Sequence, residues 1–172
     1  MKLISSAERP ALRELREEAF HLELRDDYSV PDEDDPFADW MRGVVDNSYM
    51  EPWTSVIWRV ADQGKTVRRV LAVTEPHSLY VQWEYATTPV TQHAGEDTRW
   101  LPRHGLPPGL TFPADGNDWW LFDDRILAVG HFDNTGRVPG SELIEDSDVV
   151  AECVRVRDLL SASAVAHREY KP

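Results

Sequence analysis

The last third of this 172-residue chain repeats one pattern three times: a short apolar run followed by residues that favour turns. The runs cover residues 119–122, 125–132 and 137–144, and the joints fall at 123–124 and 134–136. Asp, Asn and Gly at such joints are typical of tight β-hairpin turns. Strands joined this closely can pair only as antiparallel neighbours, so the pattern predicts a β-meander.

Elsewhere the apolar residues repeat with helical spacing, and Ser, Asp, Gly and Pro mark the expected helix ends. The predicted helices cover residues 7–18, 36–42, 52–64, 78–89 and 147–164. A period of two from Phe20 to Leu24 predicts a strand, as do the runs 66–74 and 98–101. The strands cluster rather than alternate regularly with helices. We therefore expect an α+β fold: a mainly antiparallel sheet of about five strands, with four or five helices on one face.

The chain length predicts a single domain over residues 1–172, with a frayed tail at about 167–172. Residues 102–117 hold four prolines and three glycines and show no periodicity. A loop of this length is either a lid or binding loop, or a rigid surface crossing.

The composition excludes several classes of protein. A single cysteine, Cys153, rules out an internal disulfide and any cysteine-rich zinc site. The first residues resemble no signal peptide, and no run approaches the roughly 20 apolar residues of a membrane span. We therefore expect a cytoplasmic protein. The formal charge of −13 repels phosphate backbones, so we expect no direct nucleic-acid binding; it suits a basic protein partner, or serves only solubility.

The densest group of reactive side chains lies between residues 94 and 133. Its acids and its histidine could hold a divalent metal or carry out acid–base chemistry, or the acids could simply form turns: Glu96, Asp97, Asp118, Asp123, Asp124, Asp133 and His131. No zinc-protease, P-loop, dinucleotide-binding or serine-hydrolase motif occurs, and we expect no cofactor.

Arginines lie beside tryptophans in the same region. Arg99 and Arg103 flank Trp100, and Arg68 and Arg69 lie on the valine-rich run. Such pairs can grip a carboxylate or phosphate, although Arg99 could instead pair internally with an acid such as Glu96, Asp97 or Asp118. Trp119 and Trp120 are adjacent, so in a strand they face opposite ways. The candidate binding residues are therefore Glu96, Arg99, Asp118, Trp120, His131 and Trp83.

Six short motifs occur in a fixed order along residues 20–133. They are Phe20-x-Leu-Glu-Leu-Arg-Asp-x-Tyr28, Gly64-x-x-Val-x-Arg-Val70, Glu75-Pro-x-x-x-Tyr80, Ala94-Gly-Glu-Asp-x-Arg99, Asp118-x-Trp-Leu-Phe-Asp123 and His131-Phe-Asp133. In these motifs the chain resembles an actinobacterial family of unknown function, often encoded near helix-turn-helix regulators of the WhiJ type. The resemblance implies a cytoplasmic accessory of such a regulator and supplies no catalytic residues.

Three functional hypotheses follow. The main one is a non-enzymatic regulatory protein that binds a protein partner, such as a basic DNA-binding regulator, and that could form a homodimer. The first alternative is a metal-assisted hydrolase or nuclease-like enzyme that uses Glu96, Asp118, Asp123 and His131. The second is a sensor of small anionic molecules, with Arg99, Trp83 and Trp120 around its pocket.

Overall fold

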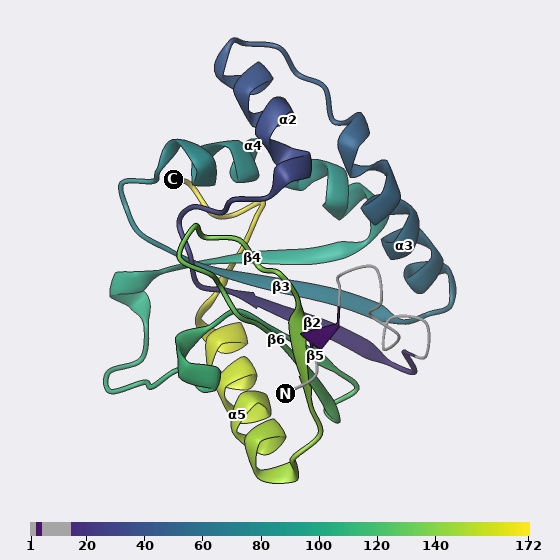
Figure 1. Ribbon diagram of the computed structural model, residues 1–172, viewed down its shortest axis with the longest axis vertical. Coiled ribbons are helices and arrows are strands. Elements are labelled where there is room, and N and C mark those ends of the chain that lie inside the picture. Colours follow the sequence, from purple (N-terminus) through teal and green to yellow (C-terminus); the bar gives the residue numbers. More distant parts are fainter. Residues whose placement is uncertain (1–2, 5–14) are drawn as a thin grey trace.

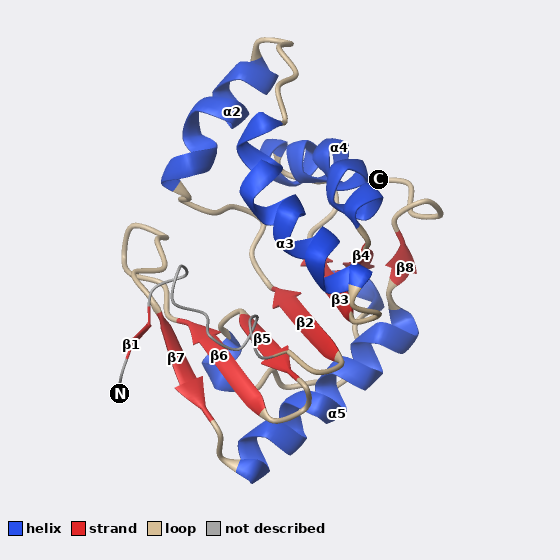
Figure 2. Cartoon of the chain, turned by 90° about the vertical axis from the view of Figure 1, so that its right-hand side faces the viewer, coloured by secondary structure: helices blue, strands red, loops and turns tan. Residues whose placement is uncertain are grey.

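Strands from both ends and the middle of the chain form one sheet. The computed structural model describes residues 3–4 and 15–172. Within them the sheet has eight strands in the order β1-β7-β6-β5-β2-β3-β4-β8 (Figure 2). In chain order the strands are β1 (Leu3–Ile4), β2 (Glu18–Glu23), β3 (Thr66–Val73), β4 (Glu96–Pro102), β5 (Trp119–Phe122), β6 (Ile126–Gly130), β7 (Ser141–Ile144) and β8 (Val165–Ala166).

Four α-helices accompany this sheet in the described part of the chain. They are α2 (Pro31–Met41), α3 (Glu51–Asp62), α4 (Leu79–Ala94) and α5 (Ser147–Ser163), and short 3-10 turns lie at η2 (Ser48–Met50), η3 (Arg103–Gly105) and η4 (Ala114–Gly116). The α+β class is confirmed. None of the described helices is long and apolar enough to cross a membrane.

The sheet is larger than we expected, and its centre is parallel. β2 pairs in parallel with β3, and β3 with β4, because helical crossovers connect them. The predicted meander is present as β5, β6 and β7, whose neighbours all pair antiparallel. The period-two run from Phe20 belongs to β2, which joins the meander to the parallel strands. Most pairings are antiparallel, as predicted, but the expected number of about five strands was too low.

Helices cover both faces of the sheet rather than one (Figure 1). The reason lies in the alternation along β2. Phe20 and Leu22 are fully buried on the face that packs against α5, in a core that includes Trp119 and Leu160. The intervening residues point to the opposite face, where α3 and α4 pack, so neither face of the sheet is left to solvent.

Two helix boundaries differ from the prediction. α2 begins at Pro31 rather than Pro36, because Pro31 occupies the first turn and acidic residues follow it there, where the helix dipole favours them. α4 begins directly after Ser78, the first residue of the predicted helix, but it continues through Pro89 to Ala94, with Gly95 as its C-cap. Tertiary packing on both sides of Pro89 outweighs the local cost of the proline, since Thr88 and Thr91 are both buried.

The C-terminal residues are packed, not frayed. β8 pairs with β4, and the Tyr170 side chain is buried, with its hydroxyl donating to Glu75 at 2.6 Å. In the loop 102–117, Leu106, Leu110 and Phe112 pack against the core beneath α5, so this loop is a packed surface crossing. Most of the predicted helix 7–18 lies outside the described residues; at its end, Glu18 already belongs to β2.

Candidate functional site

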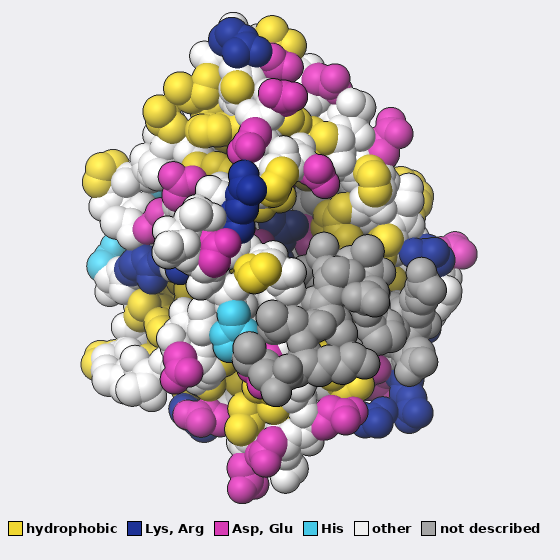
Figure 3. Space-filling model, viewed as in Figure 1, with side chains coloured by type: hydrophobic (Ala, Val, Ile, Leu, Met, Phe, Trp, Pro, Cys, Tyr) yellow, Lys and Arg dark blue, Asp and Glu magenta, His cyan; other side chains and the backbone are white. Residues whose placement is uncertain are grey.

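A cavity of about 580 Å³ lies on the sheet face opposite α5. Its walls come from β2, β3, β5 and β6, from the first turns of α2 and α4, and from the loops 28–30 and 132–141. Figure 3 shows the molecular surface hollowed near its centre, where hydrophobic, basic and acidic side chains meet. A concave site of this size suits a small molecule.

Strand register brings the polar residues of the cavity floor together. His21 and Glu23 are two residues apart on β2 and therefore share one face. His21 lies opposite Arg69 of β3 on one side and opposite Trp120 of β5 on the other. The His21 ring stacks on the Trp120 ring, with centroids 4.1 Å apart and planes 12° from parallel. This stacking holds the imidazole flat against the cavity wall.

Glu23 orients both the histidine and the arginine of the floor. Its Oε1 lies 3.1 Å from His21 Nδ1 and 3.5 Å from Arg69 Nη1. Arg69 Nη2 lies 2.9 Å from Glu96 Oε2, so the guanidinium is held between two carboxylates. Because Nδ1 of His21 faces a carboxylate, it carries the proton, and Nε2 is the nitrogen free to accept one.

The carboxyl groups of the cavity divide into two classes. Burial alone would raise the pKa of Glu23, but Arg69 and His21 outweigh it and lower the pKa to about 2. Glu84 of α4 lies close to Glu23, and burial together with the charge of Glu23 raises its pKa well above the ordinary value. Glu84 as a residue is only half-buried, yet its Oε2 is fully buried. The pKa values of these two neighbouring carboxyl groups are therefore shifted in opposite directions, down in Glu23 and up in Glu84.

Two further carboxyl groups, those of Asp118 and Glu33, line what we call the upper half of the cavity, and each lies beside a tyrosine. The Tyr28 hydroxyl donates to Asp118 Oδ2 at 2.6 Å, and the Tyr80 hydroxyl donates to Glu33 Oε2. Burial raises the pKa of both Asp118 and Glu33, even though the tyrosine hydrogen bonds act in the opposite direction. The backbone N–H of Leu24 also donates to Asp118 Oδ1 at 2.8 Å.

The structure separates the six candidate binding residues. Asp118 and Trp120 line the cavity. Glu96 lies beneath its floor, as the second partner of Arg69. Trp83 is buried in α4 and packs against Phe37, Tyr49 and Tyr80 outside the cavity lining.

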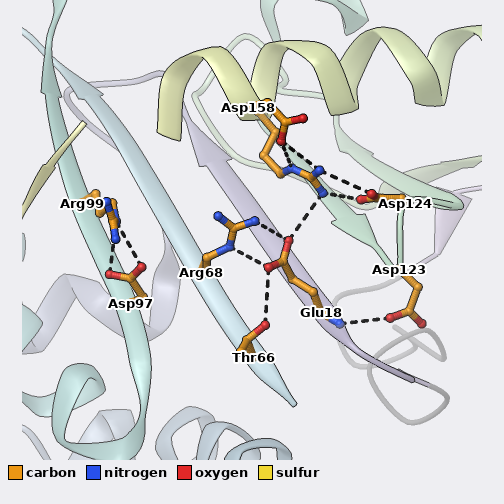
Figure 4. A network of polar contacts seen from close by, with 9 residues as sticks. Glu18, Thr66, Arg68, Asp97, Arg99, Asp123, Asp124 and Asp158 are labelled. Atoms are coloured by element: carbon orange, nitrogen blue, oxygen red, sulfur yellow. Dashed lines mark hydrogen bonds and ion pairs between the residues drawn. The ribbon is translucent and has the colours of Figure 1, made fainter. Parts of the chain in front are cut away.

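Arg99 and His131 form pairs elsewhere. Arg99 lies on the other face of β4, where its Nε contacts Asp97 Oδ2 at 3.0 Å (Figure 4). His131 pairs with Glu142 at 2.8 Å. The expected pocket of Arg99, Trp83 and Trp120 is therefore not assembled.

The proposed metal-ligand set is also dispersed. Asp123 lies in the turn after β5 and accepts backbone N–H groups of residues 16–18 at 2.8–3.1 Å. Asp124 pairs with Arg157 of α5, which also contacts Glu18 (Figure 4). Over residues 3–4 and 15–172, no group of three or more His, Cys, Asp or Glu side chains is arranged to hold a metal ion.

The sequence pattern indicated the positions of the floor residues but not their role. His21 and Glu23 are the polar residues that alternate with the apolar ones from Phe20 to Leu24 in the predicted strand, and we assigned no function to them. Arg69 was noted only as a possible anion ligand on a valine-rich strand. Glu84 was missed entirely, because a glutamate on a helix is usually exposed.

Comparison with known proteins identifies the family and the fold. The profile of a domain of unknown function, DUF6879, matches residues 7–172. A comparison with curated proteins gives no match. Among solved structures, NucT from Helicobacter pylori is similar with a TM-score of 0.50 and 13% identity, covering 91% of this chain and 86% of that one. Nuc from Salmonella typhimurium, a phospholipase D family member, has a TM-score of 0.52 and 10% identity, covering 95% and 88%.

These findings correct our main functional hypothesis. We expected a non-enzymatic regulatory protein that binds a protein partner. The fold is instead similar to that of NucT and of a phospholipase D family member, and this similarity overturns that hypothesis. The acidic composition misled us, because net charge describes the bulk surface and carries no information about a concave site.

Proposed function

The chain belongs to the DUF6879 family, and from that premise we propose that its cavity hydrolyses a phosphodiester bond by general acid–base catalysis. The bond class is taken from the phospholipase D family member that shares the fold. The observation that carries the proposal is the floor of the cavity, where Glu23 lies 3.1 Å from His21 Nδ1 and has a lowered pKa, while the pKa of the neighbouring Glu84 is raised. Environments that drive two neighbouring pKa values apart are characteristic of acid–base pairs in enzymes.

Each floor residue has a role in this reaction. His21 Nε2 takes a proton from water as the water oxygen bonds to phosphorus, and Glu23 stabilises the resulting imidazolium through Nδ1. The ester P–O bond then breaks, and the leaving oxygen takes the proton of Glu84. A water molecule returns the proton from His21 to Glu84. Arg69 keeps Glu23 ionised and in place, and is therefore a positioning residue.

The protonated state of Glu84 also bears on substrate charge. A cavity with every carboxyl group ionised would repel a phosphodiester anion. The raised pKa of Glu84 reduces this repulsion at the floor of the cavity, and in its protonated form Glu84 can donate a hydrogen bond.

The test is turnover of bis(p-nitrophenyl) phosphate and of a short single-stranded DNA by the full chain, with and without EDTA. We expect His21→Gln and Glu84→Gln each to lower kcat by at least about 100-fold. His131→Gln is the matched control, because His131 also pairs with a glutamate but lies outside the cavity lining. It should keep full activity.

The pH profile separates catalysis from a structural effect. Activity should fall as pH rises through the raised pKa of Glu84, because the donor proton is then lost. In Glu84→Gln that limb should disappear from the residual activity. Absence of turnover on both substrates, full activity in His21→Gln, or loss of activity in His131→Gln would overturn the proposal.

A further inference from the structure

Acidic side chains outnumber basic ones around the cavity. Its described lining contains two arginines and six acids: Glu23, Asp32, Glu33, Glu84, Asp118 and Asp133. One of the arginines, Arg69, is already held between Glu23 and Glu96. The other, Arg137, is a single cation against the remaining carboxyl groups of the lining.

A buried acceptor at the floor also lacks a donor. Glu23 Oε2 is fully buried and has no hydrogen-bond partner among the residues that the structure describes. It belongs to a carboxylate whose side chain is only 12% exposed. A buried ionised oxygen without a partner is costly, and it adds to the unbalanced negative charge of the cavity.

Above this floor, two tyrosine–carboxyl pairs lie side by side, with their tyrosine rings in contact. Tyr28 with Asp118 and Tyr80 with Glu33 come from four separate segments, and the two tyrosine rings lie 5.8 Å apart. In each pair the hydroxyl uses its proton on the carboxyl group. What remains for a ligand are carboxyl oxygens and ring faces, both of which attract cations.

A third ring extends this aromatic wall. Phe132 lies 5.9 Å from Tyr28, and the guanidinium carbon of Arg25 lies 3.7 Å from the Phe132 ring centre. The protein's own side chain thus already places a guanidinium on one ring of this wall. Cation–aromatic contacts of this kind act within about 6 Å of a ring centre.

From these contacts we infer that the upper half of the cavity binds an organic ammonium or guanidinium group, held by Glu33, Asp118 and the rings of Tyr28 and Tyr80. A small molecule that carries this group fills a cavity of about 580 Å³. The substrate is accordingly a phosphodiester with a cationic substituent. That last statement rests on the proposed function, whereas binding of the cation does not.

The test uses four aromatic probes of similar size: benzylammonium, benzylguanidinium, benzyl alcohol and benzoate. Binding to the full chain is measured by titration calorimetry at pH 7. We expect one or both cations to bind at least 10-fold more tightly than benzyl alcohol, and benzoate to bind least. The two cations distinguish an ammonium site from a guanidinium site. Equal affinity for cation and alcohol would overturn the inference.

Two variants on one helix locate the site. Glu33→Gln should weaken cation binding at least 10-fold and leave the alcohol unchanged. Asp35→Asn removes the same charge from an exposed position of α2 outside the cavity lining, and should leave cation binding within 2-fold. Equal effects of the two variants on cation binding would indicate only the long-range attraction of the protein's negative charge and would contradict a specific cation site at Glu33. Asp118→Asn, which keeps the acceptor for Leu24, provides a second test.

These experiments distinguish failure of the cation site from failure of the proposed hydrolysis. His21→Gln should lower kcat for hydrolysis by at least about 100-fold while the cation still binds, because His21 lies on the floor of the cavity. Selective cation binding without phosphodiester turnover in the unmodified chain would refute the hydrolase and retain the cation site. Turnover without any preference for cations would refute the cation site and retain the hydrolase.

Discussion

Replacing Arg69 by methionine tests the electrostatic core of the cavity. Arg69 lies between Glu23 and Glu96, and its side chain is 19% exposed. Holding the pKa of Glu23 at about 2 instead of 4.5 corresponds to about 3 kcal/mol, at 1.36 kcal/mol per pH unit. Breaking a buried ion pair by removing one partner costs about 3–5 kcal/mol. We therefore expect Arg69→Met to lower the free energy of unfolding at pH 7 by about 3–5 kcal/mol.

The lowered pKa of Glu23 also predicts how the loss of stability in Arg69→Met varies with pH. Glu23 has a lowered pKa in the folded state, so its stabilising effect is complete above its unfolded pKa and is lost as pH falls towards about 2. The difference between the parent chain and Arg69→Met should thus be largest above about pH 5 and shrink below it. Urea unfolding followed by tryptophan fluorescence, at several pH values, measures both quantities.

Arg99→Met is the matched control for this experiment. Arg99 also pairs with a neighbouring carboxylate, but the pair with Asp97 is about 40% exposed on both sides. Its loss should cost less than about 1 kcal/mol. The reasoning is refuted if Arg69→Met lies within about 1 kcal/mol of the parent chain, or if the difference does not vary with pH.

Three further predictions concern the fold around the cavity. Gly95→Ala should destabilise the chain by more than about 1 kcal/mol, measured by thermal unfolding, since φ is +114° and the added Cβ would lie 3.0 Å from Ala61 Cβ. Asp123→Ala should cost about 2 kcal/mol and speed amide exchange at residues 16–18, whose N–H groups it accepts; unchanged exchange would count against this. Cys153 is fully buried and its pKa is raised to about 12, so it should resist iodoacetamide until the chain unfolds.

Local chemistry made part of the fold predictable. The joints at 123–124 and 134–136 predicted the meander. Ser78, and either Asp146 or Ser147, were the caps expected for two helices, and the side chains of Ser78 and Asp146 do accept backbone N–H groups there. Local chemistry failed at Pro89, which ends most helices but lies within α4, because buried contacts on both sides hold the helix together. It also placed the start of α2 five residues late, since two prolines there both resemble a first helical residue.

The candidate site was predictable only in fragments. Asp118 and Trp120 were singled out from the sequence and do line the cavity. Burial raises the pKa of Asp118 and the charge of Glu23 acts in the same direction, whereas the hydrogen bond from Tyr28 lowers it; all of these depend on distant segments. Glu96 and Arg99 stood close together in the sequence but lie on opposite faces of β4, because odd and even positions of a strand point apart.

The sequence by itself determined the α+β class, the meander and the alternation that gives β2 one apolar and one polar face, because each depends on neighbours a few residues apart. Only the tertiary structure decided what lies over that polar face. α4 brings Glu84 onto it, and β3 and β5 place Arg69 and Trp120 on either side of His21. Burial and the distance between charges set a pKa, and both depend on segments far apart in the chain, which no local pattern records.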